Sequence, residues 1–348
     1  MNIAVLVSGG VDSSVALALL KEQGHAVTAF YLKIWLEDEL AFLGDCPWEQ
    51  DLAYVRAVCK KLDVPLEIIS LQKEYHEQVV AYTISEIKAG RTPNPDILCN
   101  QRIKFGVFFD HLQQSFDYVA TGHYAQVQHH PEGSKLIRSP DPIKDQTYFL
   151  AYLSQAQLRK ALFPIGHMQK EKVRALAHEF DLPTKDRKDS QGICFLGKLK
   201  FNDFIAYHLG QKEGAIIEYE TGKKLGTHKG FWFHTIGQRQ GSGLAGGPWY
   251  VVAKDPVLNI VHMSKNYYSA DKNRNEFNVD KLHWLSGAAP NKNNLHVKIR
   301  HGKQLYDCIF DHTTGRVQLA QQDQGIAPGQ FAVFYEDQVC LGAGIIAL

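Results

Sequence analysis

The feature that most constrains the fold of this chain is a glycine turn that joins an apolar run to a helical segment near the N-terminus. Residues 2–7 form the apolar run, residues 8–12 contain two adjacent glycines, and residues 13–23 place apolar side chains on one helical face. A buried strand that turns directly into a helix is the first unit of an α/β sheet. We therefore expect a core strand here, and not a signal peptide, since no basic region or cleavage site accompanies the run.

The alternation of strands and helices continues through the first half of the chain. Residues 26–32, 66–71 and 118–121 are typical of further buried strands. Residues 52–62 repeat apolar side chains at helical spacing, with Cys59 among them. Strands that alternate with helices imply a parallel sheet that is covered on both faces.

The second half has a different pattern, in which short alternating strands replace long helices after about residue 205. Short strands punctuated by glycine and proline predict small β-barrels or sandwiches. The clearest examples are residues 295–300, 306–310, 317–320 and 330–335. We therefore predict an α/β protein that has a doubly wound parallel-sheet domain over residues 1–205, a small central β-rich domain over 206–269 and a C-terminal β-barrel over 270–348.

Composition excludes several classes of protein. Apolar residues make up 45% of the 348 positions, which is enough for a sizeable core, and no apolar run approaches the roughly 18–20 residues that cross a membrane. The six cysteines are scattered without a CxxC pair, which argues against a zinc site and against a secreted disulfide framework. We expect a cytoplasmic protein with reduced thiols, in which any disulfide is transient. The net charge of +1 argues against a protein that coats nucleic acid.

The glycine turn has the composition of a phosphate-binding loop. Its glycines let the backbone approach a ligand closely, and the amides and helix N-terminus that follow favour a phosphate. The string SGGVDSS at residues 8–14 lacks the lysine of a GxxxxGK[ST] loop, which indicates a cut at the α-phosphate with pyrophosphate leaving. The alternative is a glycine-rich turn with an ordinary serine cap. The full string resembles the signature of the N-type ATP pyrophosphatases.

Two cysteines lie in segments that suit sulfur chemistry. Cys99 follows residues 92–96, where two prolines stiffen the loop and an Asn and an Asp have the groups to hold a pyrimidine edge. We expect Cys99 at the start of the next helix, whose N-terminus would stabilise a thiolate. Cys194 follows the flexible residues 190–192, and the cations at 185, 187 and 188 would favour its thiolate. The alternative for each is a structural cysteine in the core.

Six motifs, in this order and at these spacings, resemble the tRNA 2-thiouridylase family. They are SGGVDSS, NPDILCN, TGHYA at 121–125, KDQTYFL at 144–150, SQGICF at 190–195 and HTIGQR at 234–239. The family thiolates position 2 of the wobble uridine in tRNAs for Lys, Glu and Gln. The sequence departs from the family at Thr147, where serine is more usual, at Gln240 and Ser242, and beside Arg300, where a second basic residue is missing.

The resemblance implies a role for individual residues. The catalytic residues are Cys194, which carries a persulfide, and Cys99 and Asp96. The ATP-binding residues are Val7, Ser8, Gly9, Gly10, Val11, Asp12, Ser13, Ser14, Leu32 and Gly122. The residues at the target base are Asn94, Pro95 and Asp96, and further tRNA contacts are Lys144, Asp145, Gln146, Arg300 and His301.

The resemblance also implies the partners and the reaction. Adenylation of the uridine oxygen by ATP, accompanied by Mg²⁺, turns a poor leaving group into AMP. Persulfide sulfur, supplied by a cysteine desulfurase or a sulfur-relay protein, then replaces the oxygen, and a transient Cys99–Cys194 disulfide remains. Whether the persulfide attacks directly or sulfide is released first stays open.

Two other functions are weighed against this one. An enzyme of the same fold that makes a C–N bond on a small molecule would need an amine donor and no cysteine pair. A non-catalytic RNA-binding protein with an inactive nucleotide loop would bind tRNA and release no pyrophosphate.

Overall fold

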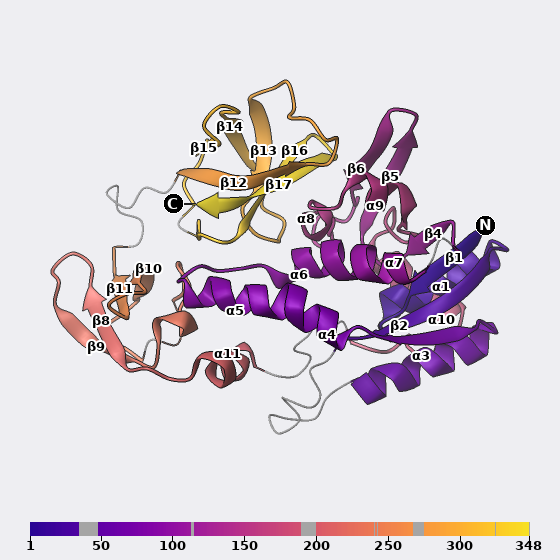
Figure 1. The fold of residues 1–348 in the computed structure, drawn as a ribbon, viewed down its shortest axis with the longest axis horizontal. Coiled ribbons are helices and arrows are strands. Elements are labelled where there is room, and N and C mark those ends of the chain that lie inside the picture. The colour runs from indigo at the N-terminus through magenta and orange to yellow at the C-terminus, as the bar shows by residue number, and fades with distance from the viewer. Residues whose placement is uncertain are drawn as a thin grey trace.

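The computed structural model describes residues 1–34, 48–112, 115–188, 200–239, 241, 243–266, 275–323 and 325–347. A parallel sheet with its helices lies at one end of the molecule, a small β sheet at the other, and a β-barrel sits beside both (Figure 1). Among the described residues no helix is both long and apolar enough to cross a membrane.

The N-terminal domain is built on a five-stranded sheet in the order β3-β2-β1-β4-β7, and every pairing in it is parallel. Its strands are β1 (Asn2–Leu6), β2 (Ala26–Lys33), β3 (Leu66–Ser70), β4 (Tyr118–Ala120) and β7 (Ala161–Leu162). The order changes direction between β1 and β4, which makes the sheet doubly wound. The sequence prediction of a parallel-sheet domain is confirmed.

Helices cover both faces of this sheet because side chains of β1 alternate between them. Ile3 and Val5 pack with α1 and α3, whereas Ala4 and Leu6 pack on the opposite face. The first face carries α1 (Val11–Glu22), α3 (Trp48–Leu62) and α10 (Lys170–Glu179). The second carries α4 (Gln72–Tyr75), η2 (His76–Val80), α5 (Ala81–Lys88), α6 (Pro95–Leu98), η3 (Cys99–Val107) and α7 (Phe108–His111).

The small sheet has the strand order β10-β11-β8-β9 around a separate apolar core that includes Ile216, Trp249 and Val261. Its strands are β8 (Gly214–Glu218), β9 (Lys224–His228), β10 (Tyr250–Asp255) and β11 (Ile260–Ser264). Helix α11 (Phe201–Leu209) precedes it, and the short helix η4 (Phe231–Phe233) lies within it. Residue 205, the expected domain boundary, falls inside α11.

Six C-terminal strands close into a barrel, because β12 pairs with both β15 and β17. They are β12 (Glu276–Trp284), β13 (Asn294–Lys298), β14 (Tyr306–Phe310), β15 (Arg316–Leu319), β16 (Phe331–Glu336) and β17 (Val339–Ala347). The predicted C-terminal barrel is confirmed.

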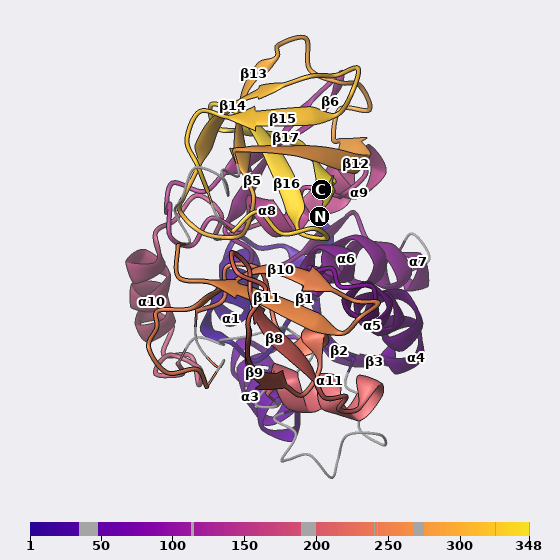
Figure 2. The ribbon, with the colours of Figure 1, turned by 90° about the vertical axis from the view of Figure 1, so that its left-hand side faces the viewer.

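A hairpin from the N-terminal half extends the barrel sheet, which the sequence did not predict. Strand β6 (Gly133–Arg138) pairs with β17 through Leu136 and Ile137, and β5 (Ala125–His130) pairs with β6. Both views place this hairpin beside the barrel (Figures 1 and 2). Helices α8 (Thr147–Leu150) and α9 (Gln155–Lys160) follow the hairpin.

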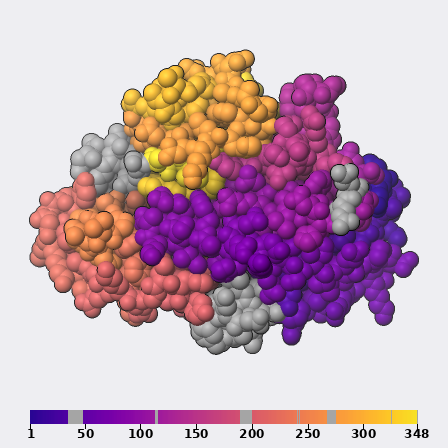
Figure 3. All heavy atoms as spheres, viewed as in Figure 1, coloured from indigo at the N-terminus to yellow at the C-terminus, as the bar shows by residue number. Residues whose placement is uncertain are grey.

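The barrel and the N-terminal domain share one hydrophobic core. Alternate residues of β16 point in opposite directions: Ala332 and Phe334 fill the barrel, while Phe331, Val333 and Tyr335 pack with the helices of the N-terminal domain. All five are fully buried. The barrel accordingly rests directly on the helical layer in the space-filling view (Figure 3).

Candidate active site

The residues expected at the nucleotide lie at the carboxyl ends of three neighbouring strands. Leu32 is near the end of β2, residues 8–14 follow β1, and Gly122 follows β4. The strand order reverses between β1 and β4, and such a switch point is where doubly wound sheets bind ligands. The structure therefore brings together all three segments that the sequence assigned to ATP.

The glycine loop is folded tightly against its own helix. Gly9 has a φ of +77°, and a Cβ there would lie 2.6 Å from the carbonyl oxygen of Asp51, so only glycine fits. The amide of Ser8 donates to Oγ of Ser13 at 3.1 Å, and the hydroxyl of Ser14 donates to the carbonyl of Gly10 at 2.8 Å. Helix α1 begins at Val11, two residues earlier than expected, and no side chain caps its N-terminus. An uncapped helix N-terminus suits a phosphate.

Gly122 is pressed against the same loop. A Cβ on Gly122 would lie 2.7 Å from the amide nitrogen of Ser13 and 2.8 Å from the carbonyl carbon of Asp12. Contacts below 3.0 Å with backbone do not occur for real Cβ atoms. The segment after β4 thus holds the nucleotide loop in place by close backbone packing.

Lys170, a charged residue that the sequence analysis did not select, contacts the glycine loop. Asp12 accepts hydrogen bonds from Nζ of Lys170 at 2.7 Å and from the hydroxyl of Tyr124 at 2.8 Å. Lys170 is buried at the start of α10. It brings an ammonium group to a loop that has no lysine of its own. Lys170 lies 158 positions from Asp12 in the sequence, so no local motif indicates that the two residues are partners.

Arg187 also faces the nucleotide loop. It donates to the carbonyl oxygen of Gly9 at 2.7 Å, forms an ion pair with Asp51 and lies over the ring of Tyr54. The sequence had grouped Arg187 with the cations near Cys194. Lys185, from the same group, pairs with Asp181 instead.

Cys99 lies one turn further into its helix than expected. The helix begins at Pro95, because proline at the first position loses no hydrogen bond and has a suitable φ. Cys99 then starts the wide-turned segment η3 and is 1% exposed. The expectation that it lies at the helix N-terminus is wrong, and the dipole effect fades beyond the first turn. Asn100 ties this helix to α8 through the carbonyl of Phe149 at 3.2 Å.

The expected RNA-contacting segments meet around Tyr148 and Phe149 of α8. The hydroxyl of Tyr148 donates to the carbonyl of Phe331 at 3.0 Å. Burial raises the pKa of Tyr148, while the hydrogen bonds with Phe331 and Asn94 and the charge of Arg300 act in the opposite direction. The ring of His301 stacks on Phe149 with the ring centres 4.5 Å apart. Three segments far apart in sequence therefore share one small region.

Arg300 is held in place by the barrel. Its guanidinium makes two hydrogen bonds to Asp323, at 3.0 and 2.5 Å, and its side chain remains 49% exposed. His301 is exposed beside it. Both residues thus lie at the surface next to α8.

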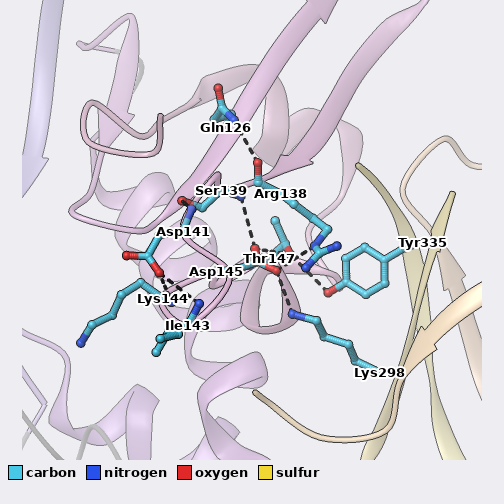
Figure 4. Close-up of polar contacts among 10 residues, drawn as sticks. All are labelled: Gln126, Arg138, Ser139, Asp141, Ile143, Lys144, Asp145, Thr147, Lys298 and Tyr335. Carbon is cyan, nitrogen blue, oxygen red and sulfur yellow. Dashed lines mark hydrogen bonds and ion pairs between the residues drawn. The ribbon is translucent and has the colours of Figure 1, made fainter. Parts of the chain in front are cut away.

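The expected tRNA contact at residues 144–146 divides between surface and interior. Asp145 is buried and pairs with Lys298 and Arg138, at 2.8 and 3.1 Å. Gln146 accepts a hydrogen bond from the amide of Tyr124 at 2.9 Å. The side chain of Lys144 extends away from the Asp145 cluster (Figure 4). Asp145 therefore has no surface to offer an RNA in this structure, which corrects its assignment as a direct contact.

The remaining candidates divide into core residues and residues outside the described part. Cys194 and Cys46 lie outside the described residues. Cys59, Cys308 and Cys340 are buried in the core, and burial raises the pKa of Cys59 to about 11. His123 is buried, contacts the Thr121 hydroxyl at 2.6 Å and has a lowered pKa because of burial.

Comparison with known proteins identifies the class and then the family. Residues 1–198 match a family model described as a tRNA methyl transferase HUP domain, residues 202–265 a PRC-barrel domain of the same series, and residues 274–346 an aminomethyltransferase beta-barrel domain. The parallel-sheet domain with its glycine loop is thus of the HUP class.

Full-length relatives narrow this class to one family. The chain is 46% identical to tRNA-specific 2-thiouridylase MnmA 1 of Bacteroides thetaiotaomicron over 99% of each chain. It is 45% identical to MnmA of Parabacteroides distasonis, also over 99% of each. The chain belongs to the tRNA-specific 2-thiouridylase family. A solved structure, NMN synthetase from Francisella tularensis, aligns with 60% of this chain and 73% of its own at 18% identity and a TM-score of 0.36.

Proposed function

We propose that this protein is a tRNA-uridine 2-sulfurtransferase, which uses ATP to replace the C2 oxygen of the wobble uridine with sulfur. The observation that carries the proposal is the arrangement of the site in a chain of this family. A phosphate-binding loop with a buried lysine lies on the same domain as a cysteine helix that borders the convergent segments 94–96, 144–146 and 300–301.

The first step is adenylation. The uridine O2 attacks the α-phosphorus of ATP, the bond to the bridging oxygen breaks, and pyrophosphate leaves. The amides of the loop and of α1 would hold the phosphates, and Lys170 would offset the charge that develops on them. Asp12, whose Oδ1 accepts hydrogen bonds from Tyr124 and Lys170, is the carboxylate of the loop that would hold Mg²⁺. Bound Mg²⁺ would neutralise phosphate charge.

The target base would lie beside Asn94. The Oδ1 atom of Asn94 is buried and has no hydrogen-bond partner among the described residues. An unpartnered acceptor of this kind suits the N3–H of a uridine. The surface residues Lys144, Arg300 and His301 would contact the surrounding RNA backbone.

The second step transfers sulfur from a persulfide on Cys194. In one route the outer sulfur attacks C2, the C2–O2 bond breaks and AMP leaves, and the Cys99 thiolate then attacks Sγ of Cys194 to release thiouridine. In the other, Cys99 attacks Sγ of Cys194 first and frees hydrosulfide, which attacks C2. Both routes end in a Cys99–Cys194 disulfide that a cellular thiol reductant must reopen. Since Cys99 is 1% exposed, its helix must open toward the site.

The sulfur reaches Cys194 from a cysteine desulfurase or a sulfur-relay protein, and the RNA substrates are the tRNAs for Lys, Glu and Gln. An enzyme in the cytoplasm would have access to both the sulfur donor and the tRNAs.

Mass spectrometry of tRNA tests the proposal. Purified protein, ATP, a persulfide donor and unmodified tRNA should give 2-thiouridine at the wobble position, with AMP and pyrophosphate as the nucleotide products. Cys194→Ser should accept no sulfur, and Cys99→Ser should accept sulfur on Cys194 yet leave the tRNA unthiolated. Cys308→Ser, a barrel-core substitution, is the matched control and should thiolate.

The same experiment separates the alternatives. A C–N ligase would keep its activity in Cys194→Ser, and a non-catalytic RNA-binding protein would release no pyrophosphate. ADP as the sole nucleotide product would contradict the adenylation step.

A further inference from the structure

A fully buried ion pair joins the barrel to the N-terminal domain. Nζ of Lys298, in β13, lies 2.8 Å from Oδ2 of Asp145, and both side chains are 0% exposed. Figure 4 shows the two side chains pointing toward each other from opposite sides of the domain junction. A buried charge is costly unless it is paired, so each of these groups depends on the other.

The strand pattern explains why the lysine is there. Leu295, Val297 and Ile299 fill the barrel, so the alternation along the strand directs Lys298 to the outside. On an isolated barrel this lysine would lie in water. It is buried only because the outer face of the barrel packs against the N-terminal domain.

Asp145 in turn organises the loop that follows β6. Its Oδ1 accepts hydrogen bonds from the amide and hydroxyl of Thr147, at 3.2 and 2.8 Å, and its Oδ2 accepts from Arg138. The Thr147 hydroxyl also lies 3.2 Å from the hydroxyl of Tyr335 in β16. The direction of the loop is therefore set by the barrel, and Lys144 is turned outward (Figure 4).

The other expected RNA segments are attached to the same strands. Arg300 and His301 follow Lys298 along the chain, with Ile299 between them and the lysine. Just before β16, Nε2 of Gln330 donates to the carbonyl of Thr92 at 3.0 Å, and the amide of Thr92 donates to the carbonyl of Pro328 at 2.7 Å. The segment 92–96, the loop 141–147 and residues 300–301 are thus all fixed relative to one another at the barrel junction.

We propose that the Asp145–Lys298 pair is a positioning device, which sets the barrel against the loop so that Lys144, Arg300 and His301 form one RNA-binding surface. Asp145 acts through Lys298 and does not touch the RNA, and Lys298 is a positioning residue to which neither the motifs nor the comparisons assign a role. The proposal rests on the proposed function only in taking tRNA as the ligand.

The electrostatics of the cluster agree with this geometry. Burial alone would raise the pKa of Asp145, but the charge and hydrogen bond of Lys298, the hydrogen bond of Thr147 and the charge of Arg138 together hold it below its usual value. The carboxylate is therefore charged and fully engaged within the protein.

Binding of unmodified tRNA without ATP, measured by filter binding on the full-length protein, tests the proposal. Asp145→Asn leaves the buried Lys298 ammonium without its carboxylate, and Lys298→Met leaves the buried Asp145 carboxylate with Arg138 in place of two cationic partners. Each single variant should raise the Kd about tenfold or more. The double variant removes both charges with little change in shape. It should bind tRNA within about threefold of wild type, because the two fully buried charges are removed together and Arg138, which is 12% exposed, keeps an amide oxygen at position 145 as its acceptor.

The double variant decides between positioning and direct contact. If Asp145 or Lys298 touched the RNA, the double variant would bind at least as weakly as the worse single variant, and the proposal would be overturned. Wild-type affinity in both single variants would overturn it as well. If a single variant fails to fold, the double variant alone gives the answer.

A surface ion pair on the same barrel gives the matched control. Lys292 and Glu336 pair in the open, with 69% and 39% of their side chains exposed. Lys292→Met with Glu336→Gln should change tRNA affinity little, since exposed pairs contribute little. Because the readout is binding, a protein that binds tRNA but transfers no sulfur would refute the proposed function and leave this inference standing.

Discussion

Replacement of Gly122 by alanine should disable the nucleotide loop without unfolding the protein. The new Cβ would lie 2.7 Å from the Ser13 nitrogen, 2.8 Å from the Asp12 carbonyl carbon and 2.9 Å from the Ser13 Cα. All three atoms are backbone, so no side-chain rotation relieves the contact. The start of α1 must move by several tenths of an ångström, and the amides that would hold the phosphates move with it.

The expected size follows from the cost of overpacking. Extra methyl groups in tightly packed sites cost about 1–3 kcal/mol, and each 1.4 kcal/mol is a factor of about ten. Since the strain falls on the loop itself, we expect the rate of tRNA-dependent pyrophosphate release at low ATP to fall about 10- to 100-fold. Calorimetric titration with ATP should show a matching loss of affinity.

Gly24→Ala provides the control. Gly24 has a φ of +77° and no atom within 4 Å of its would-be Cβ, so alanine there strains the backbone by about 1–2 kcal/mol and leaves the loop untouched. Its thermal midpoint should fall while its ATP affinity stays at the wild-type value. If Gly122→Ala bound and cleaved ATP like wild type, the steric reasoning would be wrong.

Three further predictions concern charged groups. Lys170→Met should slow pyrophosphate release about 100-fold while tRNA affinity is retained, because it removes the ammonium 2.7 Å from Asp12 at the loop; unchanged kinetics would remove Lys170 from the site. Affinity for tRNA should fall steeply with salt, and Arg300→Ala should flatten the slope by about one unit; an unaltered slope would exclude a phosphate contact there. The pKa of Asp145 is lowered in the folded state, so its stabilising effect is present above its usual value of 3.8 and is lost as pH falls through the lower, folded value. The difference in urea unfolding free energy between wild type and Asp145→Asn should therefore shrink between pH 7 and pH 3, and a constant difference would refute the linkage.

The parts of the fold that could be predicted from the sequence are those set by neighbouring residues along the chain. The glycine loop lies between a strand and a helix, and the strands after residue 275 alternate and close into a barrel. The hairpin β5–β6 escaped prediction because its side chains are mostly polar or half-buried along β5, and its partner strand β17 lies some 200 residues away. Periodicity reports burial along one strand and carries no information on which distant strand pairs with it.

The same distinction holds for the site. Motifs were sufficient to select the glycine loop, Gly122 and the segment around Cys99, because each is continuous in sequence. Lys170 and Lys298 have no motif, and both matter through partners more than 150 positions away. Lys298 would be assigned to solvent by its place in the strand pattern. Only the docking of one domain on another turns it inward, and that is a tertiary effect.

The core that the barrel shares with the N-terminal domain limits how this protein can evolve. If the barrel were joined to the rest of the protein only by a linker, recombination could replace it with another barrel, and the protein would lose only its ligand preference. Here Phe331, Val333 and Tyr335 are interior residues of the catalytic half, so a foreign barrel would have to supply the same three shapes at the same places. Substitutions in the last twenty residues should therefore coevolve with compensating substitutions near residues 136–149. The barrel and the N-terminal domain should evolve together and not as exchangeable modules.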